Sequence, residues 1–254
     1  MRPILFTIFG LNIYSYGVMM AIGIISAVTL LNYKAKKRGY NEDNLLDMAI
    51  IAVICGLLGG KLLYIITDMK NILNHTSNIK DLLTGGLVVY GSILGGAIGV
   101  ILYCKKKNWK TLEIFDLVAP GVILAQGFGR IGCFLAGCCY GKETEAFFGV
   151  EFPHSFYAPA GVKLIPTQLM SSGFDFLLAI FLIWYSRKER KSGRVFSLYV
   201  IFYSLGRFFV EFLRGDVYRG FIGPLSTSQF ISIFTIIVGI IIFNKNRFYK
   251  TIEN

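Results

Sequence analysis

The sequence predicts an all-α integral membrane protein with about seven transmembrane helices. Its composition is the first reason: of 254 residues, 54% are hydrophobic and only 16% are charged, whereas a soluble domain carries roughly 25% charged residues. The second reason is that the apolar residues form runs close to the ~20 residues that a helix needs to cross a bilayer. Because the remaining loops are short, we expect one polytopic membrane domain over residues 1–254.

Each apolar run predicts one transmembrane helix. The first run is not preceded by a basic segment, so we expect a retained span and not a cleaved signal peptide. The predicted spans cover residues 14–31, 46–66, 87–104, 114–137, 169–185, 195–213 and 230–243, the last with a start as early as 225.

The basic residues predict the orientation of these helices. The net charge is +11, but most of the Lys and Arg residues lie in four short stretches, after the first, third, fifth and seventh spans. Such alternation is the positive-inside pattern. It places the N-terminus outside and the C-terminus in the cytoplasm, with the basic stretches facing anionic lipid headgroups and not nucleic acid.

Three outer-face loops follow from this orientation, near residues 67–85, 140–166 and 214–224. The first has the mixed polar and apolar character of a helix lying on the membrane surface. The second combines Gly, Pro and aromatic residues, which favours an interfacial loop or lid over a flexible linker.

Two arginines lie inside apolar runs, Arg130 in the fourth span and Arg207 in the sixth. Charges in a bilayer are costly and usually face a protein interior or a wet cavity, where they have a function. Two such guanidiniums indicate an anion site, and a phospholipid phosphate is the abundant anion at that depth. Glu211 follows Arg207 by one helical turn, so the two side chains pair; a purely structural ion pair is the alternative.

Other residues of these runs carry weaker signals. Gly127, Gly129 and Gly132 match G-x-G-x-x-G, but without a strand and a turn before the helix we reject dinucleotide binding. The spacing of Cys133, Cys138 and Cys139 fits no standard zinc pattern. We therefore expect no metal and interpret these cysteines as small apolar residues.

Four further residues could belong to a site. Lys61 is a cation inside the second span, and Cys133 lies one turn from Arg130. Tyr16 and Tyr90 lie near span ends, where a tyrosine is often only an interfacial anchor.

Taken together, these segments resemble the bacterial prolipoprotein diacylglyceryl transferase family. The matching segments, in order, are Tyr16-Gly17, Gly59-Gly60-Lys61 with Tyr64, Gly129 to Gly137 with Tyr140-Gly141, Pro166-Thr167-Gln168-Leu169, Tyr203 to Arg214, and Leu225-Ser226 with Gln229. The chain departs from the family pattern at several positions. The family usually has His-Gly-Gly where this chain has Tyr90-Gly91-Ser92. Lys61 replaces an Arg of the family pattern, and Cys133 and Ala136 each replace an Asn.

The resemblance implies a multi-pass enzyme of the bacterial cytoplasmic membrane. It would move an sn-1,2-diacylglyceryl group from phosphatidylglycerol to the lipobox cysteine thiol in the signal peptide of a preprolipoprotein, releasing glycerol phosphate without a cofactor. We assign catalysis to Arg130, Arg207, Tyr90 and Glu211. We assign substrate binding to Tyr16, Lys61, Cys133, Gly141, Gln168 and Arg214.

Two alternatives stay open at this point. A related membrane transferase could use the same lipid donor with another acceptor, which the changes at Tyr90 and Cys133 favour. A non-catalytic lipid-binding or transport protein would also use buried Arg–Glu pairs, although no paired half-repeats of the kind common in transporters are present.

Overall fold

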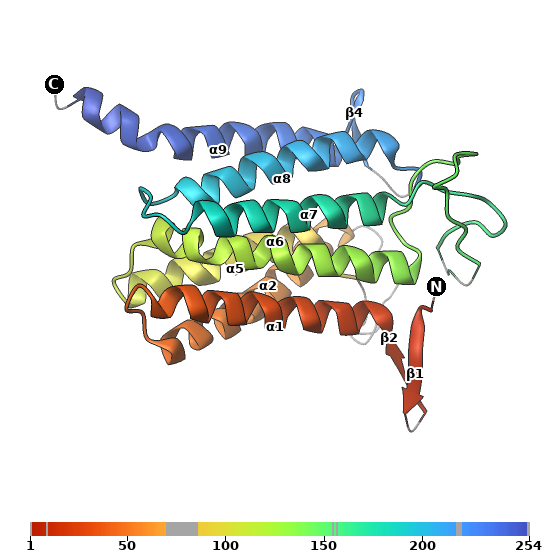
Figure 1. Cartoon of the computed structure of the whole chain (residues 1–254), viewed down its shortest axis with the longest axis horizontal. Coiled ribbons are helices and arrows are strands. Elements are labelled where there is room, and N and C mark those ends of the chain that lie inside the picture. Colours follow the sequence, from red (N-terminus) through yellow and green to blue (C-terminus); the bar gives the residue numbers. More distant parts are fainter. Residues whose placement is uncertain are drawn as a thin grey trace. The chain divides into compact units, whose positions relative to one another are not determined.

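The computed structural model describes residues 2–8, 10–69, 86–153, 155, 157–216 and 220–252. Within these residues the chain is mainly helical (Figure 1). The helices are α1 (Ser15–Lys36), α2 (Glu42–Thr67), α5 (Val89–Lys106), α6 (Thr111–Ala136), α7 (Thr167–Tyr185), α8 (Arg194–Leu213) and α9 (Thr227–Ile252). Six of them are long and apolar enough to cross a membrane, and α5 adds an 18-residue helix that ends in Lys105 and Lys106. The predicted all-α membrane fold is confirmed.

Two short hairpins were not predicted. Strands β1 (Ile4–Ile8) and β2 (Leu11–Tyr14) pair antiparallel just before α1, and β3 (Phe221–Ile222) pairs with β4 (Leu225–Ser226) just before α9. The backbone N–H of Ser15 donates to the carbonyl of Pro3 at 2.9 Å, which fastens the first hairpin to the start of α1. Strands this short have no distinct sequence period, so the pattern of apolar residues did not reveal them.

The chain forms two compact units, and the first comprises Met1–Leu31 and Phe115–Asn254. Its helices α1, α6, α7, α8 and α9 follow one another as neighbours (Figure 1). At the α1–α6 contact, a Cβ on Gly23 would lie 3.0 Å from the carbonyl oxygen of Ala125. At the α6–α7 contact, the hydroxyl of Ser172 donates to the carbonyl of Gly127 at 2.9 Å.

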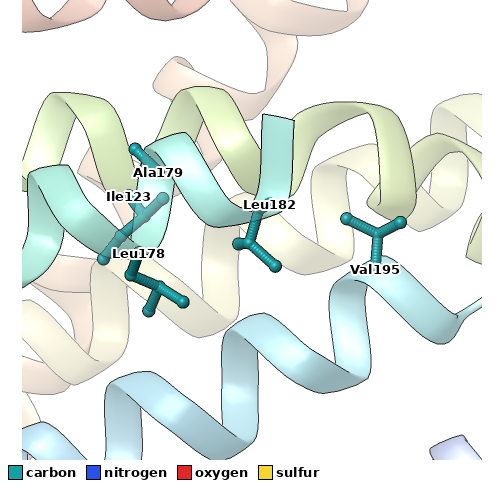
Figure 2. Packing of buried hydrophobic residues seen from close by; sticks show 5 residues of the cluster. All are labelled: Ile123, Leu178, Ala179, Leu182 and Val195. Carbon is teal, nitrogen blue, oxygen red and sulfur yellow. The ribbon is translucent and has the colours of Figure 1, made fainter. Parts of the chain in front are cut away.

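A buried apolar cluster joins three of these helices. Figure 2 shows Ile123 of α6, three residues of α7 and Val195 of α8 packed together. The α7 residues are Leu178, Ala179 and Leu182. Each is at most 5% exposed, so side-chain packing fixes α6, α7 and α8 against one another away from lipid.

Asp116 caps helix α8 from the neighbouring helix α6. Its two carboxylate oxygens accept the backbone N–H groups of Gly193 and Phe196, both at 2.7 Å. A helix N-terminus leaves N–H groups unpaired and carries partial positive charge, so a buried carboxylate is stable there. These capping contacts explain why a carboxylate is tolerated at this buried position.

The second unit comprises Asn32–Ile114, and the contact between α2 and α5 organises it. Glycines line this contact on both helices. A Cβ on Gly59 would lie 2.5 Å from the carbonyl oxygen of Gly91 and 2.9 Å from the Cα of Gly95, so no larger residue fits without moving the helices. Small residues allow this close backbone approach, as is common in membrane helix pairs.

Two of the three loops predicted on the outer face are only partly described. The surface helix expected near 67–85 falls mostly on residues 70–85, and the loop at 214–224 includes residues 217–219; both segments lie outside the described residues. The loop at 140–166 is described except at 154 and 156, and it packs tightly: Phe152 and Leu164 are each 1% exposed.

The glycine contact predicts a sharp difference between two alanine substitutions. Gly59→Ala should lower stability by about 1–3 kcal/mol, because the added methyl overpacks the α2–α5 contact. Gly173→Ala in α7 is the matched control, since nothing lies within 4 Å of its added Cβ. Thermal unfolding of both variants in the same detergent measures the effect. Equal midpoints for the two variants would contradict this account of the contact.

Candidate active site in the first unit

Helix α8 ends in a network of charged side chains. A guanidinium nitrogen of Arg207 lies 2.8 Å from the Oε2 atom of Glu211, and a guanidinium nitrogen of Arg214 lies 3.9 Å from the same oxygen. Arg214 also forms a two-pronged pair with Asp216. The side chain of Glu211 is only 2% exposed. The predicted pairing of Arg207 with Glu211 is therefore present, and it is shared with a second arginine.

The start of helix α9 supports this network. Arg207 also donates a hydrogen bond to the hydroxyl of Ser228 at 2.9 Å. Next to it, Ser226 and Gln229 cap the helix reciprocally: Gln229 Oε1 accepts the N–H of Ser226, and Ser226 Oγ accepts the N–H of Gln229. This capping box explains the Leu-Ser-x-x-Gln segment as a device that fixes the start of α9.

Arg130 lies in α6, two turns before its end. Its guanidinium interacts electrostatically with Tyr203 of α8 and Asp175 of α7. It also interacts with the guanidinium of Arg207, which it repels. In the described part of the chain, no carboxylate forms an ion pair with Arg130. The structure thus brings the two predicted arginines together and leaves one of them without a direct counter-ion among these residues.

Asp175 is a site residue that the sequence analysis did not select. It lies in the middle of α7 and is 2% exposed. Its Oδ2 atom has no hydrogen-bond partner among the described residues. An acidic residue inside an apolar run was the available signal, the same signal that singled out Arg130.

The chain turns sharply after α6. Gly137 has a φ of 75°, the left-handed conformation that commonly ends a helix, and Cys139 adopts a φ of 60°. The side chains that begin α7 hold this turn: Thr167 Oγ1 donates to the carbonyl of Cys139 at 2.9 Å, and Gln168 Nε2 donates to the carbonyl of Cys138 at 2.8 Å. Gln168, predicted to bind substrate, therefore has a clear positioning contact.

This turn gathers three cysteines. The Sγ atoms of Cys133, Cys138 and Cys139 all lie within 4.8 Å of one another, and all three side chains are partly exposed. Hydrogen bonds from the Cys133 and Cys138 thiols lower the pKa of Cys139, and the positive charges of Arg214 and Arg130 act in the same direction against the effect of burial. The sequence spacing gave no indication of this group, because a loop and not a regular motif brings the thiols together.

Gly141 and Tyr16 also belong to this end of the first unit. The N–H of Gly141 donates to the carbonyl of Ile165 at 2.9 Å, and Gly141 pairs with Arg214 in an isolated bridge. Tyr16 lies in the first turn of α1, 44% exposed, and interacts electrostatically with Cys133 and its two companion thiols. Eight predicted site residues thus meet at one end of the first unit.

Two predicted site residues belong to the second unit. Lys61 of α2 lies with its ammonium 5.2 Å from the ring centre of Tyr64, and Tyr90 lies in the first turn of α5. The N–H of Val88 donates to the carbonyl of Gly60 at 3.2 Å, which joins the start of α5 to α2 beside Lys61. Within this unit, Lys61 and Tyr90 therefore lie at the same level of the helix pair.

Known proteins similar to this chain carry one family description. The family model described as prolipoprotein diacylglyceryl transferase matches residues 3–244. A Clostridium tetani protein named phosphatidylglycerol–prolipoprotein diacylglyceryl transferase is 64% identical over 250 residues, which cover 98% of this chain and 100% of that protein. A Clostridium perfringens protein with the same name and the number 2 is 55% identical over 247 residues, covering 97% and 96%. A Clostridioides difficile protein of that name is 36% identical over 241 residues, covering 95% and 94%.

The family match covers nearly the whole chain, including every predicted site residue, and six of the helices are able to cross a membrane. The resemblance read from the sequence is confirmed: this multi-pass membrane protein belongs to the prolipoprotein diacylglyceryl transferase family.

Proposed function

We propose that this chain transfers the diacylglyceryl group of phosphatidylglycerol to the lipobox cysteine thiol of a preprolipoprotein, and that Arg130 and Arg207 hold the lipid phosphate. The names of the relatives supply the lipid donor and the protein acceptor. One observation carries the assignment of the arginines. Arg130 has no ion-pair partner among the described residues, although it lies beside the network of Arg207, Glu211 and Arg214. An anionic phosphate bound here would balance the positive charge of Arg130.

The chemistry fits a site rich in arginine. The acceptor sulfur attacks an alkyl carbon of the lipid, so no oxyanion hole is needed, and the phosphate ester leaves as glycerol phosphate. Negative charge develops on the leaving oxygen, where fixed positive groups stabilise it. Arginine suits this role because its planar guanidinium binds phosphate through two hydrogen bonds and stays charged.

Glu211 orients the arginines in this proposal. Its carboxylate contacts Arg207 and Arg214 while almost fully buried. Since Ser228 holds the same Arg207 guanidinium from α9, the side chain has little freedom to turn away from the lipid. Pre-oriented groups bind a developing charge without reorganising during the reaction.

The remaining predicted residues have supporting roles. Gln168 and Gly141 fix the loop around the thiols and Arg214 through their backbone partners. Tyr16 and Lys61 are proposed to bind substrate, and Tyr90 is proposed to donate a hydrogen bond near the reacting centre. A phenol is a poor base at neutral pH, so we assign Tyr90 no proton transfer.

We also propose that the N-terminus lies outside the cell, as the basic stretches indicate. The site end of the first unit, where α1 begins and α8 ends, then faces outward. This orientation suits an acceptor that reaches the outer leaflet on a signal peptide.

A transfer assay tests the function directly. The purified protein in phosphatidylglycerol vesicles should add a diacylglyceryl mass to a lipobox peptide and release glycerol phosphate. The same peptide with Cys→Ser is the control and should stay unchanged. Release of glycerol phosphate without modification of the peptide would point to a different acceptor, and no reaction of the lipid at all would overturn the transferase proposal.

Substitution of either arginine should remove transfer. Arg130→Ala and Arg207→Ala are each expected to lower kcat by about 100- to 1000-fold, the effect of removing one preorganised donor. Arg207→Lys should recover only part of the rate, since it keeps the charge but loses the paired hydrogen bonds. Exposed Arg187→Ala, at the other end of α7, is the control. If either alanine variant folds correctly and transfers lipid at the wild-type rate, the arginine that it replaces has no role in the mechanism.

Tyr90 has a test of its own. Tyr90→Phe removes only the hydroxyl and should lower the transfer rate about 10-fold, which corresponds to one hydrogen bond. Tyr90→His restores the residue that the family pattern has here and should keep activity. A Phe variant with undiminished rate would show that the hydroxyl plays no part, and a loss far above 100-fold would make Tyr90 a proton-transfer group.

A further inference from the structure

The three cysteines at the end of α6 form a group that the arginine-based mechanism does not use. Cys133, Cys138 and Cys139 come from the last turn of α6 and the turn after it, and their Sγ atoms lie within 4.8 Å of one another. A Zn²⁺–S bond of about 2.3 Å places sulfurs about 4 Å apart in a tetrahedral or trigonal site. Small rotations of three side chains would reach that geometry, so the group already has the spacing of a metal site.

The turn is held independently of any ligand. Thr167 and Gln168, the first two residues of α7, bind the carbonyls of Cys139 and Cys138, and both are 1% exposed. Cys139 keeps a left-handed φ of 60°, unusual for a residue with a side chain. The protein therefore maintains a costly backbone conformation that keeps all three sulfurs together, whereas burial of three small apolar side chains does not require it.

The surrounding charges match a thiolate–metal group. Three thiolates around a divalent cation carry one net negative charge. Arg130 acts electrostatically on Cys133 and Cys139, and Arg214 acts on Cys139. Two guanidiniums therefore lie where they compensate this charge, and burial of a charged group is tolerated when it is paired.

The three thiols do not by themselves form a closed metal site. Among the described residues, no fourth Cys, His, Asp or Glu joins the three thiols, and each of them is partly exposed. Structural zinc sites are closed by four protein ligands, whereas catalytic sites have three and keep the fourth position for water or substrate. The open side of this group therefore leaves room for an incoming ligand.

We propose that Cys133, Cys138 and Cys139 bind one Zn²⁺ ion and that its fourth position takes the acceptor cysteine as a thiolate. This deepens the proposed function and rests on it for the identity of the acceptor. A thiol that coordinates zinc loses its proton, so the ion supplies at neutral pH the nucleophile that a free thiol with pKa ~8.5 provides poorly. This chain then has no need of a histidine at position 90 to deprotonate the acceptor.

The step balances without a redox partner. The acceptor S–H bond breaks as the sulfur binds the ion, and the proton passes to water. A sulfur–carbon bond then forms while the carbon–oxygen bond to the lipid phosphate breaks. The electron pair of that bond leaves on the phosphate oxygen of glycerol phosphate, beside Arg130 and Arg207.

Metal binding is tested first, with Co²⁺ alone as the probe. The purified full-length protein, stripped with a chelator, should bind one Co²⁺ per chain with a thiolate charge-transfer band and the visible bands of a tetrahedral ion. Zn²⁺ should displace it. Cys133→Ser and Cys139→Ser should weaken Co²⁺ binding more than about 100-fold, since even changes outside the ligand set cost 10- to 100-fold. Cys55→Ser, a partly buried cysteine outside the group, should bind as the wild type does.

Thermal unfolding of each variant without metal separates loss of a ligand from loss of the fold. Should both serine variants unfold, the wild-type spectrum alone decides the matter. The absence of a thiolate band in folded wild-type protein overturns the site.

Transfer is then measured on the same samples. Metal-stripped protein should transfer lipid to the lipobox peptide at least about 100-fold more slowly, and Zn²⁺ should restore the rate. Proton transfer by general acid–base catalysis contributes an effect of that size. Transfer that stays unchanged in stripped protein overturns the role of the ion in the reaction. Protein that binds Co²⁺ but never transfers lipid when loaded with Zn²⁺ overturns the proposed acceptor reaction and leaves the metal site standing, so the two failures are distinguished.

Discussion

The candidate site depends on keeping charged side chains stable at the end of an apolar group of helices. Glu211 is almost fully buried, and removing one partner from a buried ion pair leaves an uncompensated charge that costs about 3–5 kcal/mol. Arg207 and Arg214 both contact its Oε2 atom, at helical spacings of four and three residues. Because residues at those spacings share one helix face, α8 assembles this network largely by itself. The other helices then pack around a charge cluster that is already neutralised in part.

Arg130 is different, since α6 supplies it no such partner. Asp175 of α7 acts on it electrostatically, and its positive charge also acts on Arg207. Two cations held near each other with an incomplete set of counter-ions form a site that an anion stabilises. The apolar cluster of Ile123, Leu178 and Val195 fixes the three helices that carry these charges, so packing holds the cations in place against their repulsion.

The turn after α6 links this charge arrangement to the thiols. The left-handed residues Gly137 and Cys139 fold the chain back over Cys133, and the side chains of Thr167 and Gln168 hold the reversed segment. Strained backbone persists only where the surroundings enforce it, and such strain often occurs at functional sites. In the proposed reaction, the arginines serve the leaving phosphate and the thiol group serves the attacking sulfur. The two halves of a displacement are thus provided by adjacent parts of one end of the first unit, from α6, α8 and the turn after α6.

The sequence by itself determined the membrane class, the approximate bounds of the seven helices in the described residues, the family and the Arg207–Glu211 pair. These follow from composition, run length and helical spacing, which act over a few neighbouring residues. Tertiary structure alone decided that Arg130 meets Arg207, that Asp175 is buried where it acts on Arg130, and that Gln168 holds a turn. It also decided that three irregularly spaced cysteines converge, because a loop fixed by side chains of another helix brings them together. Contacts between residues far apart along the chain depend on packing and loop geometry, which no local period of the sequence encodes.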